Sequence, residues 1–215
     1  MNTFFTSDQH FQHANILKFG RGNGRFRSIN EHDAYLQQKW WEVVKPEDTV
    51  YVLGDAAMGL IEDSIQKFAS LPGNKLFVPG NHDHIFSGMS KNHVARHMPL
   101  YEAVGFTILP ETLTLDIPTS TGHTEVLLSH FPYAATEHEK AEKFAKNRPV
   151  FNQQPLIHGH THSTERFNPN NPYEFHVGVD ANDFTPVNIT EISAWLDILP
   201  APDKRKNVKR RGASD

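Results

Sequence analysis

Five short apolar segments, each followed at once by residues that bind metal ions, constrain this chain more than any other feature. The segments have strand length, and several are rich in β-branched or aromatic residues: NTFF (2–5), TVYVL (49–53), KLFV (75–78), TEVLL (124–128) and PLI (155–157). The residues that follow them supply seven candidate metal donors, namely Asp8, His10, Asp55, Asn81, His130, His160 and His162. In an open α/β sheet, ligands bind beyond the carboxyl ends of parallel strands. The sequence therefore predicts that donors far apart in the chain meet at one sheet edge.

Helical patterns separate the first three of these segments. A capping box of Ser28 and Glu31 precedes apolar residues at helical spacing (Leu36, Trp40, Val43 and Val44), and a second such pattern follows (Ile61, Ile65, Phe68 and Ala69). Strand, helix and strand in alternation indicate parallel pairing with right-handed crossovers. Further strands are expected in 106–117 and 173–179, and a closing helix is expected after Asn188. We predict one mixed α/β domain with a second sheet over residues 1–200.

Composition narrows the chemistry that this domain can carry. The chain has no cysteine and 14 histidines, so a metal must be held by His, Asp, Glu, Asn or backbone groups. No segment reaches the roughly 18 consecutive apolar residues of a membrane span, and the N-terminus lacks the pattern of a secretory signal. These features predict a cytoplasmic protein with no membrane partner. Its oligomeric state is not readable from the sequence.

The C-terminal residues 201–215 form a separate, basic segment. The run KRKNVKRR (204–211) carries six positive charges, although the whole chain has a formal net charge of −4. We expect a solvated tail without regular structure. Contact with nucleic acid is the alternative interpretation, because a basic run neutralises phosphates.

The number of donors indicates two metal ions. Seven candidates exceed the roughly four ligands of a closed zinc site. Asp55 is the candidate bridge, because a carboxylate has two oxygens and Asp55 follows the central strand. Mixed imidazole, carboxylate and amide donors favour Mn, Fe, Zn, Co or Ni over Mg or Ca. If the backbone is extended, Asp8 and His10 point to the same side, as do His160 and His162.

In this order the five blocks D-x-H, GD, GNHD, H and GHTH resemble the signature of the calcineurin-like metallophosphoesterases. They run from Asp8 to His162. The resemblance implies a four-layer αββα sandwich with two mixed β-sheets and a dinuclear centre at one sheet edge. It assigns Asp8, His10 and His162 to one metal, Asn81, His130 and His160 to the other, and Asp55 to both. The segment VGVDANDFTPVNITEI (177–192) is also similar to the end of small prokaryotic and phage members.

One block departs from the protein phosphatase branch of that family. The second block reads GDAAMGL here, so Met58 and Gly59 stand where that branch has an acid and a phosphate-binding arginine. Protein phosphatase activity is therefore disfavoured. His82, beside Asn81, is the candidate catalytic residue, since it could protonate the leaving oxygen while a metal-bridging hydroxide attacks phosphorus. Asp83 or a backbone carbonyl is the candidate group that orients His82.

Several other residues are candidates for contact with substrate or with the donors. His158 is expected beneath the metals, where it would orient them. His13 is expected at the start of the first helix, either contacting substrate or merely beginning the helix. Arg21, Arg25 and Arg27 lie in a glycine-rich loop that either closes over a phosphate or is simply solvated. The sequence assigns no role to the remaining histidines (32, 84, 93, 97, 123, 138 and 176), and Trp40, Trp41 and Trp195 are predicted to be core residues.

These observations predict a dinuclear metal-dependent phosphoesterase. A phosphodiesterase that hydrolyses a nucleotide or nucleic-acid ester is favoured over a phosphomonoesterase. A non-catalytic scaffold that retains the fold is the alternative from a different class, and nuclease activity has weak support from the basic tail. The substrate itself stays open, because specificity resides in loops.

Overall fold

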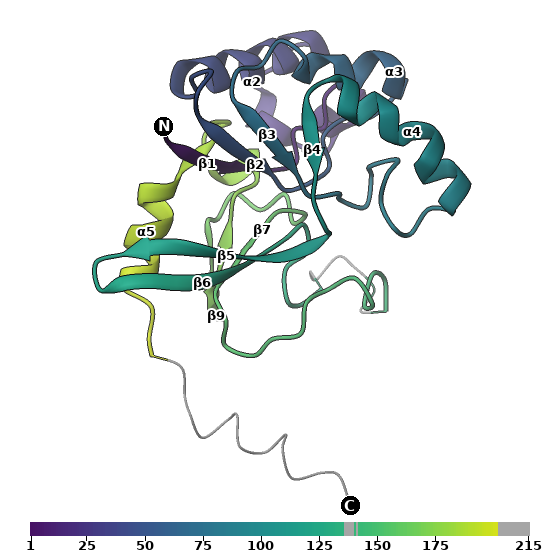
Figure 1. Cartoon of the computed structure of the whole chain (residues 1–215). Helices are drawn as coiled ribbons and strands as arrows, with labels where there is room; N and C mark the ends of the chain where they lie inside the picture. The colour runs from purple at the N-terminus through teal and green to yellow at the C-terminus, as the bar shows by residue number, and fades with distance from the viewer. Residues whose placement is uncertain (136–139, 141, 202–215) are drawn as a thin grey trace, which may run out of the picture.

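Two mixed five-stranded β-sheets form the centre of the molecule in the computed structural model, which describes residues 1–135, 140 and 142–201 (Figure 1). The first sheet has the order β10-β1-β2-β3-β4. Its bounds are β1 Thr3–Thr6, β2 Thr49–Val52, β3 Asn74–Phe77, β4 Phe106–Ile108 and β10 Val187–Asn188. Strands β1 to β4 are parallel, and β10 pairs antiparallel with β1. The predicted parallel pairing of the first three strands is confirmed.

The second sheet has the order β5-β6-β7-β9-β8. Its strands are β5 Thr112–Thr119, β6 Gly122–Ser129, β7 Leu156–His158, β8 Phe167–Asn168 and β9 Asn171–His176. Strands β5 and β6 form an antiparallel hairpin, whereas β7 is parallel to both β6 and β9. Because β6 and β7 are parallel, the residues that follow them emerge at the same edge of this sheet.

Helices flank the two sheets. They are α1 Ala14–Lys18, α2 Ile29–Val43, α3 Ile61–Ser64, α4 Lys91–Ala103 and α5 Ile189–Asp197, with 3-10 turns η1 Arg21–Gly24, η2 Ile65–Phe68 and η3 Val179–Ala181. In Figure 1, α2, α3 and α4 cover the outer face of the first sheet, and α5 lies beside β5. The predicted caps are present: Ser28 Oγ accepts a hydrogen bond from the Glu31 amide at 3.2 Å, and Asn188 Oδ1 accepts one from the Thr190 amide at 2.9 Å.

Two apolar cores hold these layers together. One lies between the first sheet and its helices, where Trp40 of α2 and Phe68 of η2 pack with strand residues such as Val52. The other lies between the sheets, where Phe5 of β1 and Leu128 of β6 are fully buried. Burial of apolar side chains on both faces of the first sheet explains why its strands are near-continuous hydrophobic runs.

Three expectations from the sequence need correction. Trp41 is 56% exposed, because neighbouring helical residues point about 100° apart and Trp40 takes the core position. Residues 106–117 divide between two sheets, since β4 pairs with β3 and β5 pairs with β6. The helical pattern that begins at Ile61 forms only one α-helical turn and a 3-10 turn.

The predicted basic tail, apart from residue 201, lies outside the described residues. Within residues 1–135, 140 and 142–201, no helix combines the length and the hydropathy that crossing a bilayer requires.

Candidate metal centre

The seven predicted donors converge where the carboxyl ends of the two sheets meet. Asp8 and His10 follow β1, Asp55 follows β2, and Asn81 follows β3 in the first sheet. His130 follows β6 of the second sheet, and His160 and His162 follow β7. Backbone hydrogen bonds connect the donor loops to each other. The His10 amide donates to the Asp55 carbonyl at 3.0 Å, and the Gly159 amide donates to the His130 carbonyl at 3.0 Å. The site is thus assembled from both sheets.

Four of the donors form one compact group. Asp8, His10, Asp55 and His162 each place a ligand atom within 4.8 Å of the others. His10 Nε2 lies 3.2 Å from His162 Nε2 and 3.4 Å from Asp55 Oδ2. Three of these residues are buried, so their polar atoms are enclosed and face one another.

The remaining three donors form a second group beside the first. His130 Nε2 lies 3.1 Å from Asn81 Oδ1 and 3.2 Å from His160 Nδ1. The same nitrogen lies 3.5 Å from Asp55 Oδ1. Asp55 therefore turns Oδ2 toward the first group and Oδ1 toward the second, which is the arrangement that a shared carboxylate requires.

The imidazoles of His130 and His162 have the orientation that metal ligands usually have. His130 Nδ1 lies 2.8 Å from the carbonyl oxygen of Leu53, which can only accept, so Nδ1 carries the proton and Nε2 faces the donors with a free lone pair. Metal-ligating histidines commonly donate their other ring N–H to a carbonyl or carboxylate in this way. His162 Nδ1 lies 3.0 Å from Asp180 Oδ2 and 2.8 Å from Arg21 Nη2, so its Nε2 is the ring nitrogen that faces the donors. The donor set thus fits a divalent transition metal.

The backbone at five of the seven donors is left-handed rather than extended. Asp8, His10, Asp55, His160 and His162 have φ values of 62°, 49°, 54°, 73° and 51°. The expectation that extended backbone would align alternate donors is therefore wrong, although the donors do converge. Non-glycine residues with positive φ are uncommon and cluster at functional sites, where packing enforces them.

Two glycines allow the donor loops to approach each other closely. Gly54 has a φ of +85°, and a Cβ there would lie 2.5 Å from the Gly80 nitrogen and 2.9 Å from His130 Nδ1. A Cβ at Gly159 would lie 2.5 Å from Asp8 Oδ2. Both positions therefore exclude a side chain on steric grounds.

Opposite charges set the protonation of the buried donors. Burial alone would raise the pKa of Asp8, but His162 and His130 outweigh it and lower that pKa to about 2. Burial likewise opposes ionisation of Asp55, whereas His130 and His10 hold its pKa well below the usual range. Burial lowers the pKa of His10 to about 4, against the hydrogen bond to Asp55. Ionised carboxylates beside a neutral imidazole are the forms that bind metals.

Asp180, which no sequence motif indicates, supports the first group. Its Oδ2 accepts a hydrogen bond from Arg21 Nη2 at 2.6 Å and lies 3.0 Å from His162 Nδ1. Arg21 is buried and also donates to the carbonyls of Asp8 and Gln9, at 2.8 Å and 3.2 Å. Arg21 thus ties ligand loops together in this structure, and its predicted closure over a phosphate stays a prediction. Only the three-dimensional fold brings Asp180 to Arg21, so spacing gave no signal for it.

Asp83 does not orient His82. Its carboxylate accepts hydrogen bonds from the amides of Gly80, Asp55 and Ala56, at 2.7, 2.8 and 3.2 Å, and from the Tyr101 hydroxyl. Burial and the charge of Asp55 raise the pKa of Asp83 to about 7, although the backbone hydrogen bonds lower it. Asp83 therefore fixes the loop that carries Asn81. Among the described residues, the His82 ring donates no hydrogen bond to a backbone carbonyl either.

His82 lies at the open side of the donors. Its Nε2 is 4.0 Å from Asp55 Oδ2, and its side chain is 44% exposed. It lines a cavity of about 670 Å³ together with His10, His162 and His13. His13 is the N-cap residue of α1, as predicted, and its ring centroid is 5.3 Å from that of His10. An exposed imidazole beside the donors can reach a molecule bound in this cavity.

Among the described residues, the side chains of His158 and Arg25 make no hydrogen bond to the side chain of a donor. His158 is buried and stacks on His176 with ring centroids 5.3 Å apart, and its Nδ1 lies 2.9 Å from the Gly159 carbonyl oxygen. His158 would thus help to orient His160 and His162 by holding the loop after β7, which carries both of them. Arg25 pairs with Asp183 at 3.3 Å on the surface and lies over the ring of Tyr35.

Comparison with known proteins gives consistent matches. A family model described as the calcineurin-like phosphoesterase superfamily domain matches residues 1–178, which include all seven donors. The Gene 66 protein of Mycobacterium phage D29 is 33% identical over 215 residues, which cover 96% of each chain. The Gene 66 protein of Mycobacterium phage L5 is 33% identical over 189 residues, or 84% of this chain and 87% of that protein. The crystal structure of AQ665 from Aquifex aeolicus, a protein of unknown function, matches with a TM-score of 0.63 and 25% identity, covering 90% of this chain and 98% of the other.

Proposed function

This chain belongs to the calcineurin-like phosphoesterase superfamily, and from that premise we propose that it is a dinuclear phosphodiesterase acting on nucleotide or nucleic-acid esters. Metal-dependent hydrolysis of a phosphoester follows from membership of the family. The two ions, the diester preference and the nucleotide-type substrate are the proposed part.

The geometry of Asp55 is the observation that carries the proposal of two ions. Its two carboxylate oxygens face two separate groups of donors, through Oδ2 to His10 at 3.4 Å and through Oδ1 to His130 at 3.5 Å. We assign Asp8, His10 and His162 to one ion and Asn81, His130 and His160 to the other, with Asp55 shared. Imidazole nitrogens together with carboxylate and amide oxygens suit Mn, Fe, Zn, Co or Ni.

Bound ions of this kind would supply an activated water near neutral pH and positive charge for the phosphate oxygens. The chain's own residues supply the remaining functions. Arg21 and Asp180 hold His162 and the backbone of Asp8 in position, because both groups are buried and hydrogen-bonded. Asp83 fixes the loop that presents Asn81 and His82 through three backbone hydrogen bonds.

His82 is proposed to donate a proton to the leaving oxygen. Its ring is exposed to the cavity, whereas the imidazoles of His10 and His130 are enclosed by the donors. A general acid contributes about 10²-fold to 10⁴-fold to a rate. That contribution is largest when the leaving group is strongly basic, as a sugar hydroxyl is.

The charge around the cavity favours a diester over a monoester. Among the described residues that line it, Arg21 is the only arginine or lysine, and Asp180 already pairs with its guanidinium at 2.6 Å. A monoester dianion therefore finds little positive charge beyond the metals, whereas a diester carries one negative charge fewer. Apolar side chains in the same lining, including Ile16, Phe19 and Phe184, could contact a nucleoside or another organic group of the ester.

The test compares two diesters that differ in their leaving group. Metal-stripped protein is reconstituted with Mn²⁺ and assayed with bis(4-nitrophenyl) phosphate, which has an activated leaving group, and with a dinucleotide, which does not. His82→Ala is expected to lower turnover of the dinucleotide about 10²-fold to 10⁴-fold, with a smaller loss for the aryl ester and unchanged metal content. His123→Ala, at an exposed position near the start of β6, is the matched control and should leave both rates unchanged.

Two results would contradict the proposal. An equal loss for both diesters would mean that His82 does not protonate the leaving group. No turnover of either diester, or of 4-nitrophenyl phosphate, with Mn, Fe, Zn, Co or Ni would favour the non-catalytic scaffold instead.

A further inference from the structure

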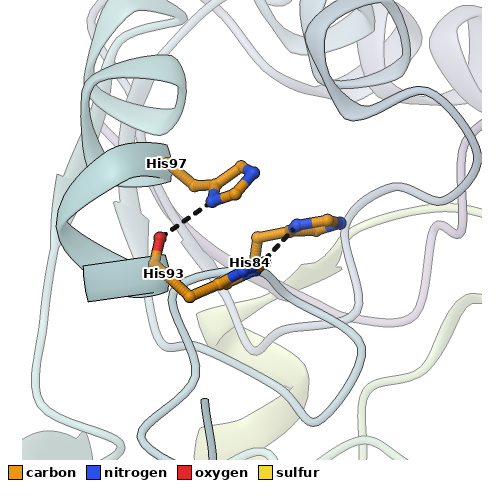
Figure 2. A group of neighbouring side chains, drawn as sticks. All are labelled: His84, His93 and His97. Atoms are coloured by element: carbon orange, nitrogen blue, oxygen red, sulfur yellow. Dashed lines mark hydrogen bonds between the residues drawn. The ribbon is translucent and has the colours of Figure 1, made fainter. Parts of the chain in front are cut away.

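Three histidines without an assigned role form a second cluster on the other side of the loop that follows β3. His84 lies in that loop, and His93 and His97 lie on α4 (Figure 2). One ring nitrogen from each residue lies within 4.8 Å of the others. The ring centroids are 5.1 Å apart for His84 and His93, 4.5 Å for His84 and His97, and 4.1 Å for His93 and His97. None of the three belongs to the donors described above.

The helix explains why two of these rings meet. His93 and His97 are four residues apart on α4, so they lie one above the other on the same helix face. A pair of histidines at this spacing can bind one metal ion from a single helix. The loop then brings His84 to the same place, with its Nδ1 3.1 Å from His93 Nε2.

The backbone fixes the tautomer of His97 in the form that a metal ligand needs. His97 Nδ1 lies 2.8 Å from the carbonyl oxygen of His93, which can only accept a hydrogen bond. Nδ1 therefore carries the proton, and Nε2 keeps its lone pair. Metal-ligating histidines typically donate their other ring N–H to a carbonyl in this way.

The surroundings favour the neutral form of His84 and leave the cluster within reach of solvent. His97 is buried, with 8% of its surface exposed, whereas His84 and His93 are half-buried. Burial lowers the pKa of His84, and the neighbouring His97 and His93 lower it further. A neutral imidazole is the form that binds a metal, and the partial exposure leaves an entry path for the ion.

We propose that His84, His93 and His97 bind a further transition-metal ion of the zinc type, separate from the dinuclear centre. Three imidazole nitrogens leave a fourth position for water in a tetrahedral site. Zn, Co, Ni or Cu suit such a donor set, whereas Mg and Ca prefer oxygen ligands.

A bound ion would clamp the loop after β3 onto α4. The His84 amide already donates to the Tyr101 hydroxyl at 3.1 Å, and that hydroxyl donates to Asp83 at 3.3 Å. Asp83 in turn accepts from the Asp55 amide. The further ion would therefore stabilise the same loop that carries Asn81 and His82.

The first test needs no variant. Crystals of the full chain are soaked in Zn²⁺, and anomalous diffraction is recorded on both sides of the zinc absorption edge. The expected result is a peak about 2.0 to 2.1 Å from one ring nitrogen of each of the three histidines. Zinc peaks at the dinuclear centre with none at this cluster would overturn the proposal.

The second test counts the ions in solution. Metal-stripped protein is dialysed against buffered Zn²⁺, and the zinc bound per chain is measured for wild type, His93→Gln and the exposed control His123→Gln. His93→Gln should bind one ion fewer than the other two proteins, and its melting temperature should respond less to Zn²⁺. His84→Gln is a second variant in the loop that should give the same loss if His93→Gln fails to fold. Equal zinc content in folded His84→Gln and wild type would refute the site.

Discussion

Replacing Asp180 with asparagine tests how much the ligand loops depend on one buried ion pair. Asp180 and Arg21 are 2.6 Å apart, and their side chains are only 7% and 2% exposed. The Asp180→Asn variant keeps the size of the side chain but removes the charge that neutralises Arg21. It also removes the carboxylate beside His162 Nδ1.

The expected effects follow from burial and from ligand orientation. Leaving a buried charge without its partner costs about 3 to 5 kcal/mol in the free energy of unfolding. Loss of a group that orients a metal-ligating histidine typically lowers metal affinity about 10-fold to 100-fold. We therefore expect a large loss of stability without metal, together with weaker binding of metal ions.

The chain supplies a matched control in the Arg25–Asp183 pair. These side chains are 3.3 Å apart, but they are 45% and 70% exposed, so water already screens them. The Asp183→Asn substitution should lower the free energy of unfolding by about 1 kcal/mol at most. Stability is measured by urea unfolding in the presence of a chelator, and metal affinity by competition between the folded proteins and a Mn²⁺ indicator.

A double variant separates stability from ligand orientation. Arg21→Met combined with Asp180→Leu replaces the pair with apolar groups of similar size, which often restores stability. Metal affinity should stay low, because Arg21 also donates to the Asp8 carbonyl and Asp180 lies beside His162. Equal destabilisation by Asp180→Asn and Asp183→Asn, or unchanged metal affinity in Asp180→Asn, would refute this reasoning.

Three further changes test other parts of the structure. Gly159→Ala should lower the free energy of unfolding by about 1 to 3 kcal/mol and weaken metal binding, because the alanine Cβ would lie 2.5 Å from Asp8 Oδ2. An unchanged metal affinity, measured by titration, would contradict the close packing of these loops. Asp83→Asn should lower the free energy of unfolding in urea by about 1 to 3 kcal/mol, since an amide NH₂ cannot accept the backbone hydrogen bonds that the carboxylate accepts. An unchanged free energy of unfolding would show that the loop does not need these hydrogen bonds. Burial lowers the pKa of His176 to about 3 from 6.5, so its contribution to stability is complete above about pH 6.5 and falls as the pH decreases toward 3. When the pH is lowered from 7 to 5, the free energy of unfolding of the metal-free His176→Phe variant should therefore fall by about 2 kcal/mol less than that of the wild type. If the free energies of unfolding of the two proteins change with pH in parallel, the assignment to His176 is wrong.

Local sequence was sufficient to predict strands β1, β2 and β3 of the first sheet and the donors that follow them. The runs before Asp8 and Asp55 are apolar because the sheet is covered on both faces, and parallel strands bring their carboxyl ends to one edge. The convergence of Asp8, Asp55 and Asn81 could thus be predicted from one sheet, whereas the approach of His130 to Asp55 depends on how the two sheets pack. The caps at Ser28 and Asn188 were also predictable, since they depend on residues within one turn.

Features that depend on packing between distant segments were not predictable. The left-handed backbone at His160 is enforced by the two hydrogen bonds that its amide makes to the Asp8 carboxylate, 152 residues away in sequence. Asp180 gains its role only because η3 lies beside Arg21 in the fold. The exposure of Trp41 follows from which face of α2 meets the sheet.

Because the donors are divided between the two sheets, they are synthesised at different times. Asp8, His10, Asp55 and Asn81 leave the ribosome first, whereas His130, His160 and His162 come from strands β6 and β7, far later in synthesis. An emerging chain that ends before residue 160 holds at most five of the seven donors, because His160 and His162 are still missing. The full donor set is therefore completed only after strand β7 of the second sheet has been synthesised.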